Sequence, residues 1–119
     1  MDNAQGQEQI RKRIQEMAEE LRNSPRRRVV KQAKVVYGNF MFVLDCYIRD
    51  LSEDGARLKI DNPSEVPDQF HLFIPSEYLI FKSHVRWKKD GEIGIEFDGL
   101  PRNVLTDTDP RLSRFKFSS

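Results

Sequence analysis

The stretch that decides the fold is IRDLSEDGARLKI, residues 48–60, near the middle of the chain. Its two ends are typical of β-strands, in which successive side chains face opposite sides of a sheet. Between them stand Asp50, Ser52 and Gly55. Asp and Ser side chains often bond backbone amides in turns, and glycine adopts positive φ without steric cost. The stretch therefore predicts a tight turn that joins two strands.

Further β-like runs lie on both sides of this turn, with no helical pattern between them. Together the strand runs are QAKVVY (32–37), FVLDCYIRD (42–50), GARLKI (55–60), QFHLFIP (69–75), LIFKSHVRWKK (79–89) and EIGIEF (92–97). A turn over 38–41, a Pro-rich loop over 61–68 and the hairpin dipeptide Asp90–Gly91 separate them. Six closely spaced strands predict a mainly β domain over residues 25–100, a small antiparallel barrel or sandwich.

The N-terminal segment, residues 1–24, has a helical pattern after a polar start that we expect to be frayed. From about Glu8 to Arg22, apolar residues recur at helical spacing and form one stripe. Pro25 then ends the helix. The stripe either packs on the β domain or pairs with a second chain, which leaves a homodimer open. Its members are Ile10, Ile14, Met17 and Leu21.

The C-terminal tail, residues 101–119, has a mixed pattern. NVLTD, residues 103–107, is compatible with a short helical turn. Phe115 and Phe117 are candidates to cover one end of a barrel.

Composition limits the classes of partner. The 119 residues carry 20 Lys and Arg against 19 Asp and Glu, so a protein that coats nucleic acid through overall charge is disfavoured. The basic residues are nevertheless locally dense between Arg22 and Lys34, where no acid falls among them. The single cysteine, Cys46, lies in an apolar run and is expected to be a small buried side chain. No stretch resembles a membrane span or a secretion signal, which favours a soluble cytoplasmic protein.

The patterns that enzymes need are missing from the sequence. His71 and His84 lie on separate runs without a third metal-type residue at ligand spacing, so we expect partly exposed strand histidines and no metal. Ser52 has no histidine near it in sequence to activate it as a nucleophile. No Gly-rich phosphate loop leads into a helix, and no cofactor is expected. The sequence therefore favours a binding module and disfavours an enzyme.

Two segments carry binding chemistry. An ionised Asp50 can accept two hydrogen bonds, which matches the N1–H and N2–H₂ edge of guanine, and Ser52 faces the same side. In the upstream segment RRRVVK, Arg27 and Lys31 stand four apart, and arginine suits both phosphate and the flat face of a purine. Taken alone, the first segment is better explained as a plain turn and the second as a solvated charge run.

In the order and spacing of these two segments, the chain resembles the PilZ domain family. The motifs of that family are R-x-x-x-R and [D/N]-x-S-x-x-G. The resemblance covers residues 25–98 and includes VRW and GIEF near the last strands. The second motif matches in full. In the first, Lys31 stands where the family has its second arginine, which keeps the charge and loses the bidentate fork. The resemblance implies a six-stranded antiparallel β-barrel with an N-terminal α-helix ahead of it.

The usual ligand of that family is the bacterial second messenger cyclic di-GMP. The resemblance implies that the Arg-rich segment is ordered by the ligand and relays the signal to a partner protein through the helix. An alternative is a PilZ-like interaction module that has lost the nucleotide, and a weaker one is a small barrel that binds RNA or single-stranded DNA. The expected ligand residues are Arg26, Arg27, Arg28, Lys31, Asp50, Ser52, Gly55 and Trp87.

Overall fold

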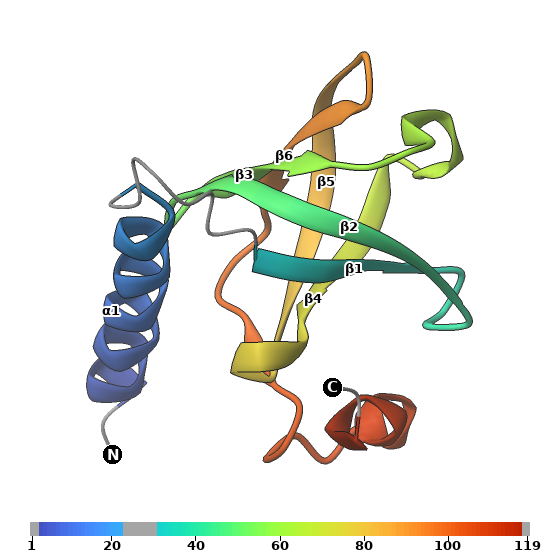
Figure 1. Cartoon of the computed structure of the whole chain (residues 1–119). Helices are drawn as coiled ribbons and strands as arrows, with labels where there is room; N and C mark the ends of the chain where they lie inside the picture. The colour runs from blue at the N-terminus through green and yellow to red at the C-terminus, as the bar shows by residue number, and fades with distance from the viewer. Residues whose placement is uncertain (1–2, 23–30, 118–119) are drawn as a thin grey trace.

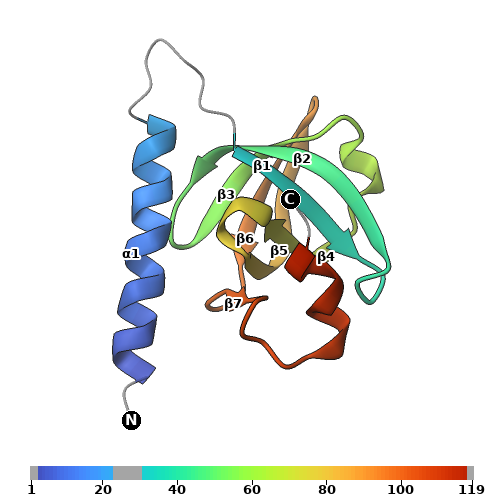
Figure 2. The same cartoon turned by 60° about the horizontal axis from the view of Figure 1, so that its bottom comes forward.

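The computed structural model describes residues 3–22 and 31–117 of the chain (Figures 1 and 2). All of the predicted strands are present, together with three 3₁₀ helices, labelled η. The elements are α1 (Asn3–Arg22), β1 (Lys31–Tyr37), β2 (Phe42–Leu51), β3 (Gly55–Lys59), η1 (Pro63–Glu65), β4 (Gln69–Ile74), η2 (Pro75–Glu77), β5 (Leu79–Lys89), β6 (Glu92–Phe97), β7 (Arg102–Asn103) and η3 (Pro110–Phe117).

The strands form one antiparallel sheet in the order β4-β1-β2-β3-β6-β5-β7. Because β4 pairs with β5 as well as with β1, the six long strands close into a barrel. The prediction of a six-stranded antiparallel β-barrel with an N-terminal helix is thereby confirmed. The short strand β7, which pairs with Leu79 and Ile80, was not predicted.

Alternation along the strands fills the barrel with apolar side chains. Val35, Ile48, Leu58, Leu72 and Ile93 come from five different strands, and each is 0% exposed. Burying an aliphatic side chain of this size contributes about 1.5–3 kcal/mol. Side chains on the other face of each strand point outward, where a binding surface can form.

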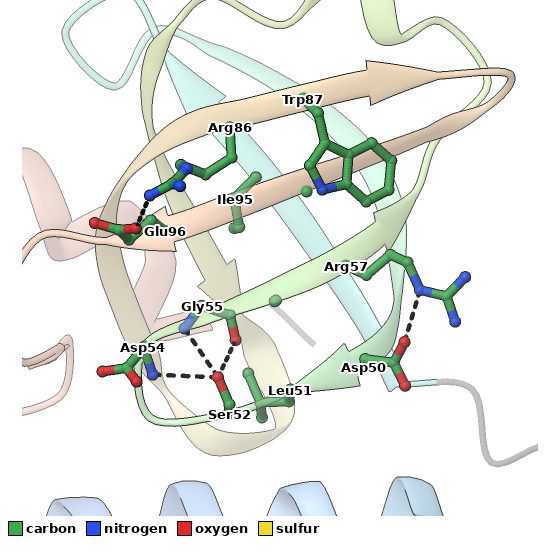
Figure 3. Close-up of a pocket in the computed structure, with 12 residues that line it drawn as sticks. Asp50, Leu51, Ser52, Asp54, Gly55, Arg57, Arg86, Trp87, Ile95 and Glu96 are labelled. Carbon is green, nitrogen blue, oxygen red and sulfur yellow. Dashed lines mark hydrogen bonds and ion pairs between the residues drawn. The ribbon is translucent and has the colours of Figure 1, made fainter.

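Two β-bulges interrupt this alternation. The register slips in β2 between Ile48 and Asp50, and in β5 between Val85 and Trp87. A bulge sets two residues opposite one and so changes the side to which later side chains point. Asp50 and Trp87, each at the far side of a bulge, both lie on the outer face of the barrel (Figure 3).

Helix α1 lies beside the barrel, against β2 (Figures 1 and 2). The prediction that its apolar stripe packs within the chain is confirmed. The helix begins at Asn3, earlier than the expected start near Glu8. Self-association through the same stripe stays a prediction, and it would require α1 to leave the barrel. The four members of the stripe, Ile10, Ile14, Met17 and Leu21, are all buried or partly buried, and Ala18 beside them is buried as well.

The C-terminal tail covers an outer face of the barrel, and not an end as expected. Phe115 is 2% exposed, and its ring centroid lies 5.0 Å from that of Phe73. The prediction for Phe117 is wrong, because this side chain is 90% exposed. Side chains three apart eclipse each other in a 3₁₀ helix, so Leu112 and Phe115 share the buried side of η3 and Phe117 does not. The cluster they join also contains Val36, Phe40, Ile80 and Val104.

The start of the tail forms the short helical turn predicted for residues 103–107. The carbonyl oxygen of Asn103 accepts hydrogen bonds from the amides of Thr106 at 3.2 Å and Asp107 at 3.0 Å. Arg102 then donates two hydrogen bonds to Asp107, each of 2.7 Å. These contacts lead the chain back across the barrel toward η3.

Candidate functional site

A pocket of about 370 Å³ opens on the outer face of the barrel, over β2, β3, β5 and β6 (Figure 3). Four of the residues predicted to bind ligand line it, namely Asp50, Ser52, Gly55 and Trp87. The turn between β2 and β3 forms one wall and the outer face of β5 the other. The fold therefore brings the D-x-S-x-x-G motif next to a tryptophan that lies more than thirty residues further along the chain.

Ser52 holds the turn together. Its Oγ accepts hydrogen bonds from the amides of Asp54 and Gly55, both at 3.2 Å. The same hydroxyl donates to the carbonyl oxygen of Gly55 at 3.2 Å, and the Ser52 amide donates to that oxygen at 2.9 Å. The prediction that the motif forms a tight turn between two strands is thereby confirmed. A ligand would find the loop already in a fixed shape, which lowers the entropy lost on binding.

Gly55 serves a different purpose from the expected one. Its φ is not positive, unlike that of Gly38, Gly91 and Gly99. Instead, a Cβ on Gly55 would lie 2.1 Å from the carbonyl oxygen of Ile95 in β6. The glycine is required because the two strands approach closely at the pocket floor, and the expectation of positive φ is wrong.

The Asp50 carboxylate is paired within the chain. Its Oδ2 accepts a hydrogen bond of 2.6 Å from Nε of Arg57 (Figure 3). Nη1 of Arg57 lies 3.2 Å from Oε2 of Glu92. The hydrogen bond to Asp50 raises the pKa of Arg57 above its usual value, so the guanidinium stays charged. Sequence reasoning missed Arg57. In β3, alternation from the buried Leu58 places Arg57 on the outer face, and this was the available signal.

Trp87 lies flat over the backbone of β6. A Cβ on Gly94 would come within 2.1 Å of the indole Nε1, so only glycine leaves room for the ring there. The Trp87 side chain is 44% exposed and lines the pocket, with Arg86 and Glu96 paired beside it (Figure 3). An exposed aromatic face of this kind can stack on a base.

A comparison with protein-family models supports what the fold and the motif indicate. The model of the PilZ domain matches residues 20–108, most of the chain. The chain belongs to the PilZ domain family. No match was found among curated proteins. A PilZ domain implies a module that binds cyclic di-GMP or a PilZ-like adaptor that interacts with partner proteins.

The other half of the PilZ site is only partly described. Arg26, Arg27 and Arg28 lie outside the described residues. Lys31 is described and does not line the pocket. Its Nζ lies 3.3 Å from Oε2 of Glu77 in η2 and 3.9 Å from Oε2 of Glu20 in α1. The structure therefore separates Lys31 from the other described residues of the predicted site.

The cysteine and the two histidines lie as the sequence predicts. Cys46 is buried, and burial raises the pKa of its thiol to about 12, which makes it a poor nucleophile. His71 and His84 are both partly exposed strand residues. Within residues 3–22 and 31–117, no three His, Cys, Asp or Glu residues are placed to hold a metal ion. In the same part of the chain, no helix has both the length and the apolar character needed to span a bilayer.

Proposed function

We propose that this PilZ domain is a cytoplasmic receptor for cyclic di-GMP that relays the nucleotide level to a partner protein without catalysing a reaction. The observation that carries the proposal is the shared pocket of Asp50 and Trp87. A carboxylate that can read the guanine edge lies on the same outer face as an exposed indole ring that can stack on a base. Membership of the PilZ domain family makes cyclic di-GMP the ligand to test first.

In this proposal Asp50 accepts hydrogen bonds from the N1–H and N2–H₂ groups of one guanine. One of its oxygens already accepts from Arg57, so the base must displace or share that contact. Arg57 is held on its other side by Glu92, which gives its guanidinium an alternative partner when the base arrives. The exchange replaces one charge-assisted hydrogen bond of Asp50 by two hydrogen bonds from the base. Each hydrogen bond to a charged group contributes about 1.5–3 kcal/mol.

In this proposal the arginine triplet binds the phosphates of cyclic di-GMP. Arg26, Arg27 and Arg28 precede β1 in sequence, and β1 pairs with β2, the strand that carries Asp50. Guanidinium groups bind phosphate bidentately and stack on purines, which are the two contacts that this ligand offers. We propose that the ligand orders this segment over the pocket.

The relay runs through α1. Residues 23–25 connect α1 to the triplet in sequence. Helix α1 also touches the motif turn, where Nε2 of Gln15 donates a hydrogen bond to Oε1 of Glu53 at 2.8 Å. Ordering of the segment and a change in the turn would both act on the helix. Ordering of the segment is then an order–disorder switch, and a partner protein can recognise the resulting change in the position of α1.

Calorimetric titration of the full chain with cyclic di-GMP tests this proposal. We expect micromolar binding in the wild type and a loss of at least about tenfold in Asp50→Asn, since a hydrogen bond to a charged group disappears. Asp45→Asn is the matched control, because Asp45 lies on the same strand and pairs with Lys34 outside the pocket. Equal binding by wild type and Asp50→Asn would remove Asp50 from the site.

A second candidate function is an adaptor that no longer binds the nucleotide. The observation in its favour is Lys31, which stands at the position of the second motif arginine and contacts Glu77 instead of the pocket. This alternative predicts no heat in the titration and capture of the same protein partner with or without cyclic di-GMP.

A further inference from the structure

Four charged side chains meet where α1, β1 and η2 come together. Glu77 stands at the centre. Its Oε1 accepts a hydrogen bond of 3.1 Å from Arg13 of α1, and its Oε2 accepts one of 3.3 Å from Lys31 of β1. Arg13 also donates to the Glu77 carbonyl oxygen at 2.8 Å, and Glu20 lies 3.9 Å from the Lys31 ammonium. The cluster holds two positive and two negative groups and joins the helix to the barrel.

Lys31 is the least exposed of these four groups. Its side chain is 11% exposed, against 24% for Glu77, 39% for Arg13 and 63% for Glu20. Its ammonium also donates to Oγ of Ser76 at 3.4 Å. A charge that is this far removed from water is stabilised by its ion-pair partners, so removing one of them destabilises the protein.

The direction of the Lys31 side chain follows from strand alternation. Ala33 and Val35, two and four residues further along β1, are buried inside the barrel, and Lys31 shares their side of the strand. Across the sheet Lys31 pairs with Ile48, which is also buried. Asp50 follows the bulge and faces outward. Lys31 cannot reach the face of Asp50 unless the start of β1 turns over.

We infer that Lys31 fastens α1 and the start of β1 to η2, and that it does not contact the ligand. Residues 23–30 run between Arg22 and Lys31, so both ends of the arginine-bearing segment are attached to elements that this cluster joins. A ligand that orders the segment therefore acts on the cluster first. This coupling rests on the proposed function, whereas the fastening of α1 does not.

The charged cluster adds to the apolar packing that holds α1 on the barrel. Three side chains of the helix are fully buried, namely Ile14, Met17 and Ala18. Most of the stability of a helix in a protein comes from the packing of its apolar face, so α1 should lose hydrogen bonds when it leaves the barrel. Undocking is therefore visible as faster exchange of its backbone amides.

The test measures amide hydrogen exchange in α1 without nucleotide, and then the dissociation constant for cyclic di-GMP. We expect Lys31→Met and Glu77→Gln each to speed exchange in α1 about tenfold, as the loss of a charged hydrogen bond implies. Lys31→Arg should restore protection. Lys34→Met is the control, since Lys34 pairs with Asp45 on the same strands but away from α1.

The nucleotide measurement decides whether Lys31 touches the ligand. Nucleotide affinity that is retained in Lys31→Met, or that changes equally in Lys31→Met and Glu77→Gln, supports a role through the helix. Unchanged α1 exchange in Lys31→Met overturns the inference, and so does affinity lost in Lys31→Met but kept in Glu77→Gln. A wild-type chain that binds no nucleotide refutes the proposed function, while the exchange data still decide the fastening of α1.

Discussion

At the scale of single residues, the floor of the pocket depends on Gly55. An alanine there would place its Cβ 2.1 Å from the Ile95 carbonyl oxygen, a backbone atom that cannot swing aside. We expect Gly55→Ala to push β3 away from β6 and to lower the free energy of unfolding by about 1–3 kcal/mol or more. Urea denaturation followed by circular dichroism measures this change.

A glycine without such a neighbour provides the control. Gly6 lies in α1, and a Cβ there would meet nothing within 4 Å. Gly6→Ala should stabilise the helix by about 0.5–1 kcal/mol, because alanine loses less backbone entropy. If Gly55→Ala unfolds at the same urea concentration as the wild type, the close approach of the two strands is not rigid.

The residue scale also shows what a sequence can and cannot reveal about a site. Asp50 and Ser52 were predicted because their motif is local and their spacing is fixed by a single turn. The partner of Asp50 was not, because Arg57 reaches it from the next strand through pairing across the bulge. The ion-pair partners of Lys31, Glu20 and Glu77, come from other elements, and no local pattern indicates them.

At the scale of elements, η3 is held by its aromatic contact with the barrel. Phe115 is buried against Phe73 in the second apolar cluster. Phe115→Ala leaves a cavity there and should destabilise the protein by about 3–5 kcal/mol. The free energy of unfolding in urea is the measurement.

Phe117 offers a matched control on the same element. It is 90% exposed, so Phe117→Ala should change the stability by no more than about 0.5 kcal/mol. Similar effects of the two substitutions would mean that η3 does not pack on the barrel as described.

Elements were predictable to different degrees for physical reasons. The six long strands follow from alternation and from turn residues, which are local signals. The bulges in β2 and β5 leave no such signal, although they decide that Asp50 and Trp87 face outward. The helix η3 was not predicted, because only two residues, Leu112 and Phe115, mark the three-residue repeat of a 3₁₀ helix.

At the scale of the whole molecule, the barrel carries α1 and η3 on different sides (Figures 1 and 2). The side covered by η3 also contains His71, whose ring centroid lies 4.5 Å from that of Phe40. Burial, followed by the nearby charges of Arg102, Lys82 and Arg111, lowers the pKa of His71 below its usual 6.5. The folded protein therefore favours the neutral imidazole.

This lowered pKa makes stability depend on pH in a defined direction. The unfolded chain takes up a proton near pH 6.5 and the folded chain only at lower pH, so stability falls as the pH drops below the unfolded value. The loss is complete below the folded pKa. We expect His71→Gln to flatten the decline in unfolding free energy between about pH 7.5 and 5.5, with His84 present in both proteins. Parallel slopes in the two proteins would contradict this.

The six strands and the helix were predictable from apolar patterns. Closure into a barrel was implied only by the resemblance to the PilZ domain family, and the patterns left open whether α1 packs on the barrel or on a second chain. What a pattern could not supply is the arrangement around the pocket. The outer face gathers Asp50, Arg57 and Trp87 from three strands, and the turn held by Ser52 gives it a fixed edge. That arrangement is the physical basis for the proposed nucleotide site.

Binding at this pocket is tested most directly by the fluorescence of Trp87, the single tryptophan of the chain. The full chain is titrated with cyclic di-GMP and, in parallel, with cyclic di-AMP, whose adenine lacks the N1–H and N2–H₂ groups that Asp50 is proposed to accept. We predict a saturable change in emission at micromolar cyclic di-GMP, no change with cyclic di-AMP, and a loss of the response in Asp50→Asn. Emission that stays constant up to millimolar cyclic di-GMP, with no heat in the calorimeter, would contradict this prediction.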